Sequence, residues 1–409
     1  MSISRLRVSN FKSFEEIDVE LGAFNVVVGA NASGKSNFTD IFRFLRDIRS
    51  SGLENAISML VGEPEYLANM YGQEHQTMIQ FFSDTSTYLS EGKRGFVRGK
   101  GLSYTFVLSF EGGGVSVLSD ELRRELEFVE EKDTCDAGDI VGTASATIMV
   151  RDRKPVLSFE TPGSIELSEE DVFPPLLAQE ELSPKSLLIE SAVPFIPSRL
   201  FGRDVRVYDF DPKLAKTGTP ATGKVDLEED GKNLAIVLRN LMQDDEKRRK
   251  FTNLVKDLLP FIDETGVEQF ADKSLLFKVR EVFPASEQQY LPASLISDGT
   301  INVIALILAL YFEKGPLAII EEPERNIHPS LLSRVVTMMK EASRNKQLIV
   351  TTHNPELIKH VDNEDVLLVS RDKRGSSSIS RPAGKESVKA FLKEDMGLDE
   401  LYVQNLLGV

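Results

Sequence analysis

Residues 29–36 of the chain, Gly-Ala-Asn-Ala-Ser-Gly-Lys-Ser, match the pattern G-x-x-x-x-G-K-[ST] at every fixed position. In such a loop, glycines let backbone N–H groups close around phosphate oxygens, the lysine reaches the β- and γ-phosphates, and the hydroxyl coordinates Mg²⁺. Lys35 and Ser36 are that lysine and that hydroxyl here. The sequence therefore predicts a nucleotide and Mg²⁺ site whose contacting residues are Asn31, Ala32, Ser33, Gly34, Lys35, Ser36 and Asn37.

Two adjacent acids, Glu321 and Glu322, follow the apolar run 317–320. Neighbouring side chains on a strand point to opposite faces of the sheet, so the two carboxylates are expected to have different tasks. We expect Glu321 to belong to the Mg²⁺ shell, directly or through water, and Glu322 to polarise the attacking water. Such a pair alone is typical of an ordinary strand end, and its combination with the glycine-rich loop favours the functional interpretation.

Two further features could contact a γ-phosphate. His353 lies just past the apolar run 347–351, where a neutral imidazole could hydrogen-bond the phosphate and take part in catalysis. Ser297 and Gly299 stand at the start of a long apolar helix, whose free N–H groups favour an anion. The alternative for this turn is an ordinary helix N-cap formed by Ser297 or Asp298.

The elements around these residues follow an α/β pattern. Residues 3–9 alternate as in a half-buried strand, and residues 24–28 form an apolar run typical of a buried parallel strand. A helix follows the glycine-rich loop, with Phe38, Ile41 and Leu45 on one face. Ligands bind at the carboxyl ends of strands in open α/β sheets, where the glycine-rich loop, the acid pair and His353 lie. Later elements are expected at 299–312, 317–320, 331–342 and 347–351, with a hairpin of 366–370 and 378–381.

The middle of the chain has a different character. Short β-like runs, such as 104–110 and 146–150, alternate with acidic and Gly/Pro-rich loops, and a helical stretch covers about 231–259. No heptad pattern is long enough for a coiled-coil arm. We therefore predict three parts: residues 1–50 and 291–409 form an ATPase head, and residues 51–290 form a β-rich and helical insertion.

Composition limits the class of protein. The chain has 409 residues, 41% of them hydrophobic, and its single cysteine, Cys135, allows neither an internal disulfide nor a cysteine-based metal site. The longest apolar stretch, 303–312, is too short to cross a membrane, and we expect a cytoplasmic protein. The net charge of -16 disfavours indiscriminate nucleic-acid coating. Basic clusters that could still contact DNA are 247–250 and Lys93, Arg94, Arg98 and Lys100.

With these motifs in this order, the chain resembles the ABC-type ATPases of the RecF/SMC/OLD group, specifically short bacterial ATPases without a long coiled coil. The resemblance covers the first fifth and the last third of the chain, and it includes the turn at 10–14. It implies a P-loop fold that binds ATP. By this likeness Ser297 to Thr300 stand at the signature motif, His353 at the switch histidine and 324–329 at the D-loop. It also implies an ATP-dependent homodimer that sandwiches two nucleotides.

Two residues depart from the group's pattern. Glu321 replaces the usual aspartate, which puts direct metal coordination in question, and Asp298 places a carboxylate near the expected γ-phosphate. The glutamine of the Q-loop has only approximate candidates, Gln76 and Gln80. The acidic Toprim domain of OLD-type nucleases is not expected in this chain.

Three functions were weighed. The first is an ATP-hydrolysing dimeric switch in DNA repair and maintenance or in antiphage defence, with DNA or a separate effector protein as candidate partners. The second is an ATP-stabilised scaffold with negligible hydrolysis that holds an effector, motivated by Asp298 and Glu321. The third, a GTPase or kinase, is weak because the sequence has no Asn-Lys-x-Asp motif for reading guanine.

Overall fold

A computed structural model describes residues 2–69, 72, 75–84, 87–92, 95–130, 140–160, 181–191, 205–283, 289–382 and 402–403. Cys135, Lys93 and Arg94 lie outside these residues. Within them, no helix combines the length and the apolar character needed to span a membrane.

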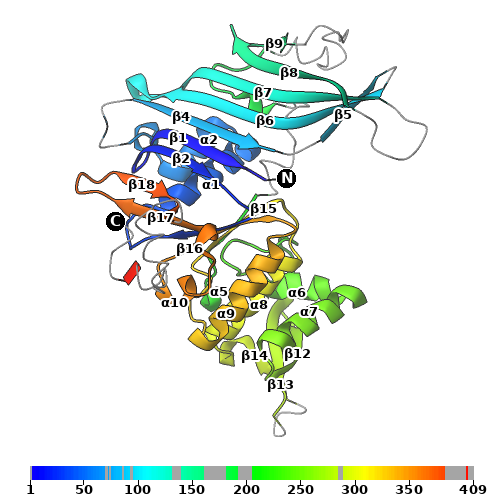
Figure 1. Cartoon of the computed structure of the whole chain (residues 1–409). Coiled ribbons are helices and arrows are strands. Elements are labelled where there is room, and N and C mark those ends of the chain that lie inside the picture. Colours follow the sequence, from blue (N-terminus) through cyan, green and yellow to red (C-terminus); the bar gives the residue numbers. More distant parts are fainter. Residues whose placement is uncertain are drawn as a thin grey trace.

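One large mixed sheet dominates the described part of the chain (Figure 1). Its strand order is β10-β15-β16-β3-β17-β18-β2-β1-β4-β6-β7-β8-β9, and β5 pairs with β6. The strands are β1 (Arg5–Phe11), β2 (Phe14–Glu20), β3 (Phe24–Val28), β4 (Gln76–Ser83), β5 (Thr87–Gly92), β6 (Gly95–Ser109), β7 (Ser116–Glu130), β8 (Ile140–Arg151), β9 (Lys154–Glu160), β10 (Val205–Tyr208), β15 (Leu317–Glu321), β16 (Gln347–Thr352), β17 (Val366–Arg371) and β18 (Ser377–Ser380).

Five neighbouring strands of this sheet, from β10 to β17, are parallel. Their carboxyl ends therefore lie at one edge, where the chain continues from β3 into the glycine-rich loop, from β15 into Glu322 and from β16 into His353. The expected hairpin is confirmed, since β17 and β18 pair antiparallel. The sheet thus brings three motifs distant in sequence to one edge.

Helices cover both faces of the parallel strands. Alternate residues point to opposite sides, so Val27 and Ile319 pack in the core of α1 (Lys35–Ser51) and α2 (Leu53–Val61). Their neighbours Val26 and Ile320 pack in a second core with the remaining long helices. These are α6 (Leu234–Met242), α7 (Asp245–Leu258), α8 (Asp298–Tyr311) and α9 (Pro329–Ala342).

Short elements complete the described chain. The helices α5 (Pro212–Ala215) and α10 (Pro355–Ile358) follow β10 and β16. A second sheet has the order β11-β13-β12, with β14 paired to β13. Its strands are β11 (Thr219–Pro220), β12 (Ile262–Gln269), β13 (Ser274–Glu281) and β14 (Leu291–Pro292). The 3-10 turns are Pro64–Leu67, Glu111–Gly113, Leu188–Glu190, Ala293–Leu295 and Asn363–Asp365.

Residues 51–290 contribute to both ends of the large sheet. Strand β4 pairs with β1 and continues into β6 to β9 at one end, and β10 pairs with β15 at the other (Figure 1). Within the described part of residues 51–290, residues 219–281 supply three strands of the small sheet together with α6 and α7, and α7 lies against α8. The division at residues 50 and 290 stays a prediction.

The helical stretch expected at 231–259 consists of two helices. The break follows Met242, and Asp244 caps α7 by accepting hydrogen bonds from the N–H groups of Glu246 and Lys247. Most of the basic cluster at 247–250 has partners within the chain: Lys247 pairs with Asp244, Arg248 with Asp245, and Lys250 lies over the Tyr311 ring. DNA contact through this cluster stays a prediction.

A buried acid fixes the segment 181–191 to the large sheet. Asp120 on β7 is 2% exposed, and its Oδ2 accepts a hydrogen bond from the Leu188 N–H at 2.6 Å. Burial raises the pKa of this carboxyl to about 7. Because the folded pKa exceeds the unfolded one, Asp120's contribution to stability is full below about pH 4 and is lost as pH rises through about 7.

We therefore expect the free energy of unfolding of Asp120→Asn to fall less than that of the wild type between about pH 5 and pH 8. The wild-type loss from this carboxyl approaches about 1.4 kcal/mol per pH unit below its pKa. The amide keeps an oxygen acceptor for Leu188 and has no proton to lose. Urea unfolding of both proteins tests this, and identical pH slopes would contradict it.

Candidate functional site

The loop between β3 and α1 has a backbone that requires its glycines. A Cβ at Gly29 would lie 2.4 Å from Ser33 Oγ and 2.5 Å from the Val369 carbonyl oxygen. At Gly34, whose φ is +116°, a Cβ would lie 2.5 Å from Ser377 Oγ. Close neighbours explain why glycine stands at both positions, and the left-handed backbone at Gly34 is a second reason there.

Lys35 folds back over its own loop. Its Nζ donates hydrogen bonds to the carbonyl oxygens of Gly29, at 2.7 Å, and Ala30, at 3.0 Å. Burial lowers the pKa of the Lys35 ammonium, against the opposing charges of Glu322, Glu324 and Glu321. The ammonium is thus held at the loop by carbonyl groups that a phosphate could replace.

The rest of the loop is fixed from two sides. Asn37 Nδ2 donates to Ser13 Oγ at 2.7 Å, and Ser377 Oγ donates to the Ser33 carbonyl oxygen at 2.7 Å. The side chains of Asn31, Ala32 and Ser36 are exposed, whereas Ser33 is buried. Among the described residues, the Ser33 hydroxyl has no hydrogen-bond partner.

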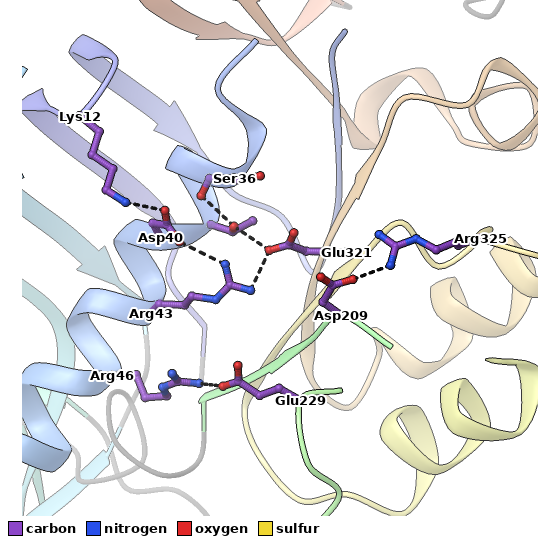
Figure 2. Close-up of polar contacts among 10 residues, drawn as sticks. Lys12, Ser36, Asp40, Arg43, Arg46, Asp209, Glu229, Glu321 and Arg325 are labelled. Atoms are coloured by element: carbon purple, nitrogen blue, oxygen red, sulfur yellow. Dashed lines mark hydrogen bonds and ion pairs between the residues drawn. The ribbon is translucent and has the colours of Figure 1, made fainter. Parts of the chain in front are cut away.

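Glu321 points toward the start of α1 (Figure 2). Its Oε1 lies 2.8 Å from Arg43 Nη2 and accepts a hydrogen bond from Thr39 Oγ1 at 3.1 Å. The same Thr39 hydroxyl also bonds the Ser36 carbonyl oxygen, so the two predicted metal ligands, Ser36 and Glu321, share a neighbour. Any metal ion here would compete with the Arg43 guanidinium for Oε1.

Glu322 contacts different partners from Glu321, and it follows the end of β15 with a left-handed φ of 44°. Its Oε1 lies 2.7 Å from His353 Nδ1, and its Oε2 lies 3.1 Å from Arg325 Nη2. Arg325 also contacts Asp209, just past β10, at 2.9 Å (Figure 2). Partial burial acts to raise the pKa of the Glu322 carboxyl, but the contacts of Arg325 and His353 outweigh it and lower the pKa. These two contacts therefore favour the ionised form of the Glu322 carboxyl.

A second buried acid lies behind Glu322. Glu324 is 6% exposed, and its Oε1 accepts a hydrogen bond from Thr352 Oγ1. Burial raises the pKa of the Glu324 carboxyl, and its Oε2 has no hydrogen-bond partner among the described residues. This acid adds negative charge near Lys35, since it contributes to the electrostatics of that ammonium.

The turn at Ser297 begins α8 as an N-cap. Ser297 Oγ accepts a hydrogen bond from the Thr300 N–H at 3.1 Å. The serine therefore forms an ordinary helix N-cap, which is the alternative interpretation of this turn. Gly299 lies against the next motif, because a Cβ there would be 2.3 Å from the Asn326 carbonyl oxygen. Asp298 forms an ion pair with Lys216, 2.5 Å away.

The structure thus gathers four predicted residues, Lys35, Glu321, Glu322 and His353, at one sheet edge. Ser297 and Gly299 pack instead at the start of α8, beside the turn that follows Glu322. The candidate Gln80 bonds Thr105 on β6, and the Q-loop glutamine remains unassigned.

Sequence reasoning missed several charged neighbours of these residues. They are Arg43, Asp209 and Lys216, together with Glu324 and Arg325, which were expected only as part of the D-loop. Only Arg43 had a usable signal, since it lies on the polar side of the amphipathic helix α1, eight residues after Lys35.

A solved structure of an SMC head shares this fold, and two further SMC heads are similar at lower TM-scores. The SMC head bound to the C-winged helix domain of ScpA has a TM-score of 0.52 and 15% identity, covering 93% of this chain and 98% of that one. The SMC head domain from Thermotoga maritima has a TM-score of 0.45 and 15% identity, covering 93% and 99%. A head with an extended coiled coil, bound to the C-terminal domain of ScpA derived from Pyrococcus furiosus, has a TM-score of 0.47 and 14% identity, covering 96% and 99%.

Two family models match parts of the chain. Residues 1–86 match "AAA ATPase domain", and residues 162–359 match "AAA domain, putative AbiEii toxin, Type IV TA system". Both parts are therefore similar to AAA-family ATPase domains, and the likeness to SMC heads concerns the fold. The predicted α/β P-loop fold of the SMC-head type is therefore confirmed. No curated protein matches the chain.

AAA-family ATPases bind ATP, generally with Mg²⁺, and the residues of this chain fit that ligand. The loop has a glycine cradle, a lysine on replaceable carbonyl groups and an unpartnered Ser33 hydroxyl. Among the residues that the structure describes, no group of three or more His, Cys, Asp or Glu side chains could hold a metal ion. Mg²⁺ would thus depend on phosphate oxygens together with Ser36 and Glu321, as is usual for this ion.

Proposed function

We propose that the chain binds ATP with Mg²⁺ and hydrolyses it to ADP and phosphate. The observation that carries this proposal is the ionised Glu322, held by His353 at 2.7 Å beside a loop whose Lys35 is already in place. A carboxylate at this position can orient a water molecule toward the γ-phosphate and accept its proton.

The contacts of Glu322 suggest how the carboxylate becomes available. A water molecule can reach a free lone pair of the carboxylate, or it can displace one of the two partners. The Arg325 contact is the longer, at 3.1 Å, and Arg325 keeps a second carboxylate partner in Asp209. We therefore assign the moving contact to Arg325, with His353 continuing to orient Glu322 from the other side.

We further propose that the ATP-bound form is a homodimer that acts as a switch. Ser297 and Gly299 begin α8 beside the 325–327 turn, so a second chain would be needed to bring such a helix start to the P-loop. The proposed setting is DNA maintenance or antiphage defence, with DNA or a separate effector protein as partner. The toxin–antitoxin description of the matching family supports the defence setting.

The second candidate is an ATP-stabilised scaffold that hydrolyses ATP negligibly. The ion pair between Arg43 and Glu321 favours it, because the guanidinium occupies the oxygen that a metal ion would use. Phosphate release by the wild-type protein separates the two functions. Turnover at an ordinary enzymatic rate, on the order of 1 s⁻¹ or above, would exclude the scaffold.

Lys35→Ala is expected to abolish ATP binding, because the β- and γ-phosphates lose the cation fixed within the loop. Calorimetric titration with Mg-ATP measures this. The matched control is Lys314→Ala, at an exposed lysine between α8 and β15, which should bind ATP as the wild type does. Unchanged ATP affinity in a folded Lys35→Ala protein would contradict the proposed site.

A further inference from the structure

Asp298 poses an electrostatic problem for the proposed dimer. It is the first residue of α8, directly between Ser297 and Gly299, which are the residues expected to face a γ-phosphate. A helix start attracts anions through its free N–H groups, but a carboxylate at the same place repels them. An unpaired Asp298 would therefore weaken nucleotide binding by the start of α8.

Lys216 of the same chain neutralises the negative charge of Asp298. Its Nζ lies 2.5 Å from Asp298 Oδ1, and the two side chains are only 24% and 33% exposed. Lys216 directly follows α5, where the nearby Lys213 is exposed. Of these two lysines on one short segment, one is directed to the start of α8 and the other to solvent.

A ring of contacts fixes this pair relative to Glu322. Asp209, which begins the segment leading to Lys216, contacts Arg325, and Arg325 contacts Glu322. The Arg325 carbonyl oxygen accepts a hydrogen bond from Asn302 Nδ2, on α8, at 2.6 Å. Lys216 then closes the ring on α8 through Asp298. The position of the Lys216 ammonium is thus set by three elements: the β10–α5 segment, the turn after β15, and α8.

We propose that Lys216 is a positioning residue of the composite ATP site, acting on the nucleotide held by the P-loop of a second copy. It neutralises Asp298, so the start of α8 remains attractive to the γ-phosphate. This inference rests on the proposed ATP-dependent dimer. It gives the segment that carries Lys216, which lies far from the motifs in the sequence, a role in the ATP site of the second copy.

Lys216→Met tests the charge while keeping most of the aliphatic stem. We expect the ATP concentration for half-maximal hydrolysis to rise at least roughly tenfold, because the unpaired Asp298 carboxylate then repels the γ-phosphate. The double variant Lys216→Met/Asp298→Asn, which removes both charges, should return this concentration to within about threefold of the wild type. Lys213→Ala, the matched control on the same segment, should have no effect. Urea unfolding verifies that each variant is folded.

The rescue separates charge neutralisation from a structural role. If Lys216 only holds the fold, the double variant will be as impaired as Lys216→Met, and the proposal is overturned. It is also overturned if Lys216→Met hydrolyses ATP with wild-type concentration dependence.

Mixing chains tests whether Lys216 acts across the dimer. A heterodimer of Lys35→Ala and Lys216→Met contains one site with an intact P-loop from one chain and an intact Lys216 from the other. At limiting ATP, the mixture should hydrolyse several times faster than the two variants measured separately. If Lys216 served its own chain's P-loop, both sites would be defective and the mixture would show no gain.

A control distinguishes failure of this inference from failure of the dimer itself. The mixture of Lys35→Ala with Ser297→Arg should regain activity through the same shared-site arrangement. Recovery there without recovery for the Lys216→Met mixture would overturn only the role of Lys216. No recovery in either mixture would overturn the composite site, and the Lys216 proposal with it.

Discussion

Replacing Glu322 with glutamine is expected to lower the rate of ATP hydrolysis at least roughly a hundredfold while ATP still binds. The amide preserves the shape of the side chain and can still contact His353 and Arg325. It cannot accept a proton from water, and it lacks the negative charge that orients the water. Phosphate release and calorimetric ATP binding, measured on the same preparation, give the two readouts.

Glu356→Gln, at an exposed glutamate of α10 a few residues after His353, is the matched control and should keep wild-type turnover. The informative comparison is Glu321→Gln. We expect this change to raise the Mg²⁺ concentration that hydrolysis requires, because Glu321 lies toward Ser36 through Thr39. Loss of turnover in Glu321→Gln with normal turnover in Glu322→Gln would reverse the roles that we assign to the two acids.

The sequence predicted those parts of the head whose signals are local. Residues 24–28 form β3 as expected, and the burial of all five side chains matches a strand covered on both faces. The glycine-rich loop, the acid pair and His353 each stand at the carboxyl end of such a strand, which made their places predictable. Glu321 and Glu322 have different partners, but Glu322 follows the end of β15 with a left-handed φ of 44°, so strand alternation alone does not set its direction.

The charged neighbours of the site could not be predicted, because they join residues far apart in the chain. Thr39 and Glu321 are 282 positions apart, and Asp209 and Arg325 are 116 apart. Periodicity reports which face of an element is buried, but it does not report which distant element covers that face. Lys216 and Asp298 gave no signal as a pair for the same reason.

The long strands of the middle were also underestimated. Residues 104–110 were expected as a short strand, whereas β6 covers Gly95–Ser109 with an irregular register between Gly99 and Leu102. Glycines in that stretch hide the strand pattern. A tertiary contact explains the glycine at position 99, since a Cβ there would lie 2.1 Å from Arg124 Nε on the neighbouring strand.

A mixture of two inactive proteins, Lys35→Ala and Ser297→Arg, is expected to hydrolyse ATP. The P-loop and the Ser297 turn lie in different parts of one chain, with Ser297 directed to its own helix α8 and Lys35 to its own loop. If each site takes its P-loop from one chain and its Ser297 turn from the other, a heterodimer of the two variants has one intact site and one doubly defective site. Partial activity should therefore return, from a background near zero.

The matched control is a mixture of Lys35→Ala with Glu322→Gln. We place Lys35 and Glu322 at the same sheet edge of the same chain, so no heterodimer of these two variants contains an intact site. This mixture should stay inactive at every ratio.

Light scattering should also show mass doubling of Glu322→Gln with Mg-ATP, because the bound ATP persists. If the Lys35→Ala and Ser297→Arg mixture stays inactive at concentrations where the wild type turns over, the two chains do not share a site, whatever their mass. A dimer formed through another surface would keep its mass without nucleotide, and for that reason the mixing result decides between shared and separate sites.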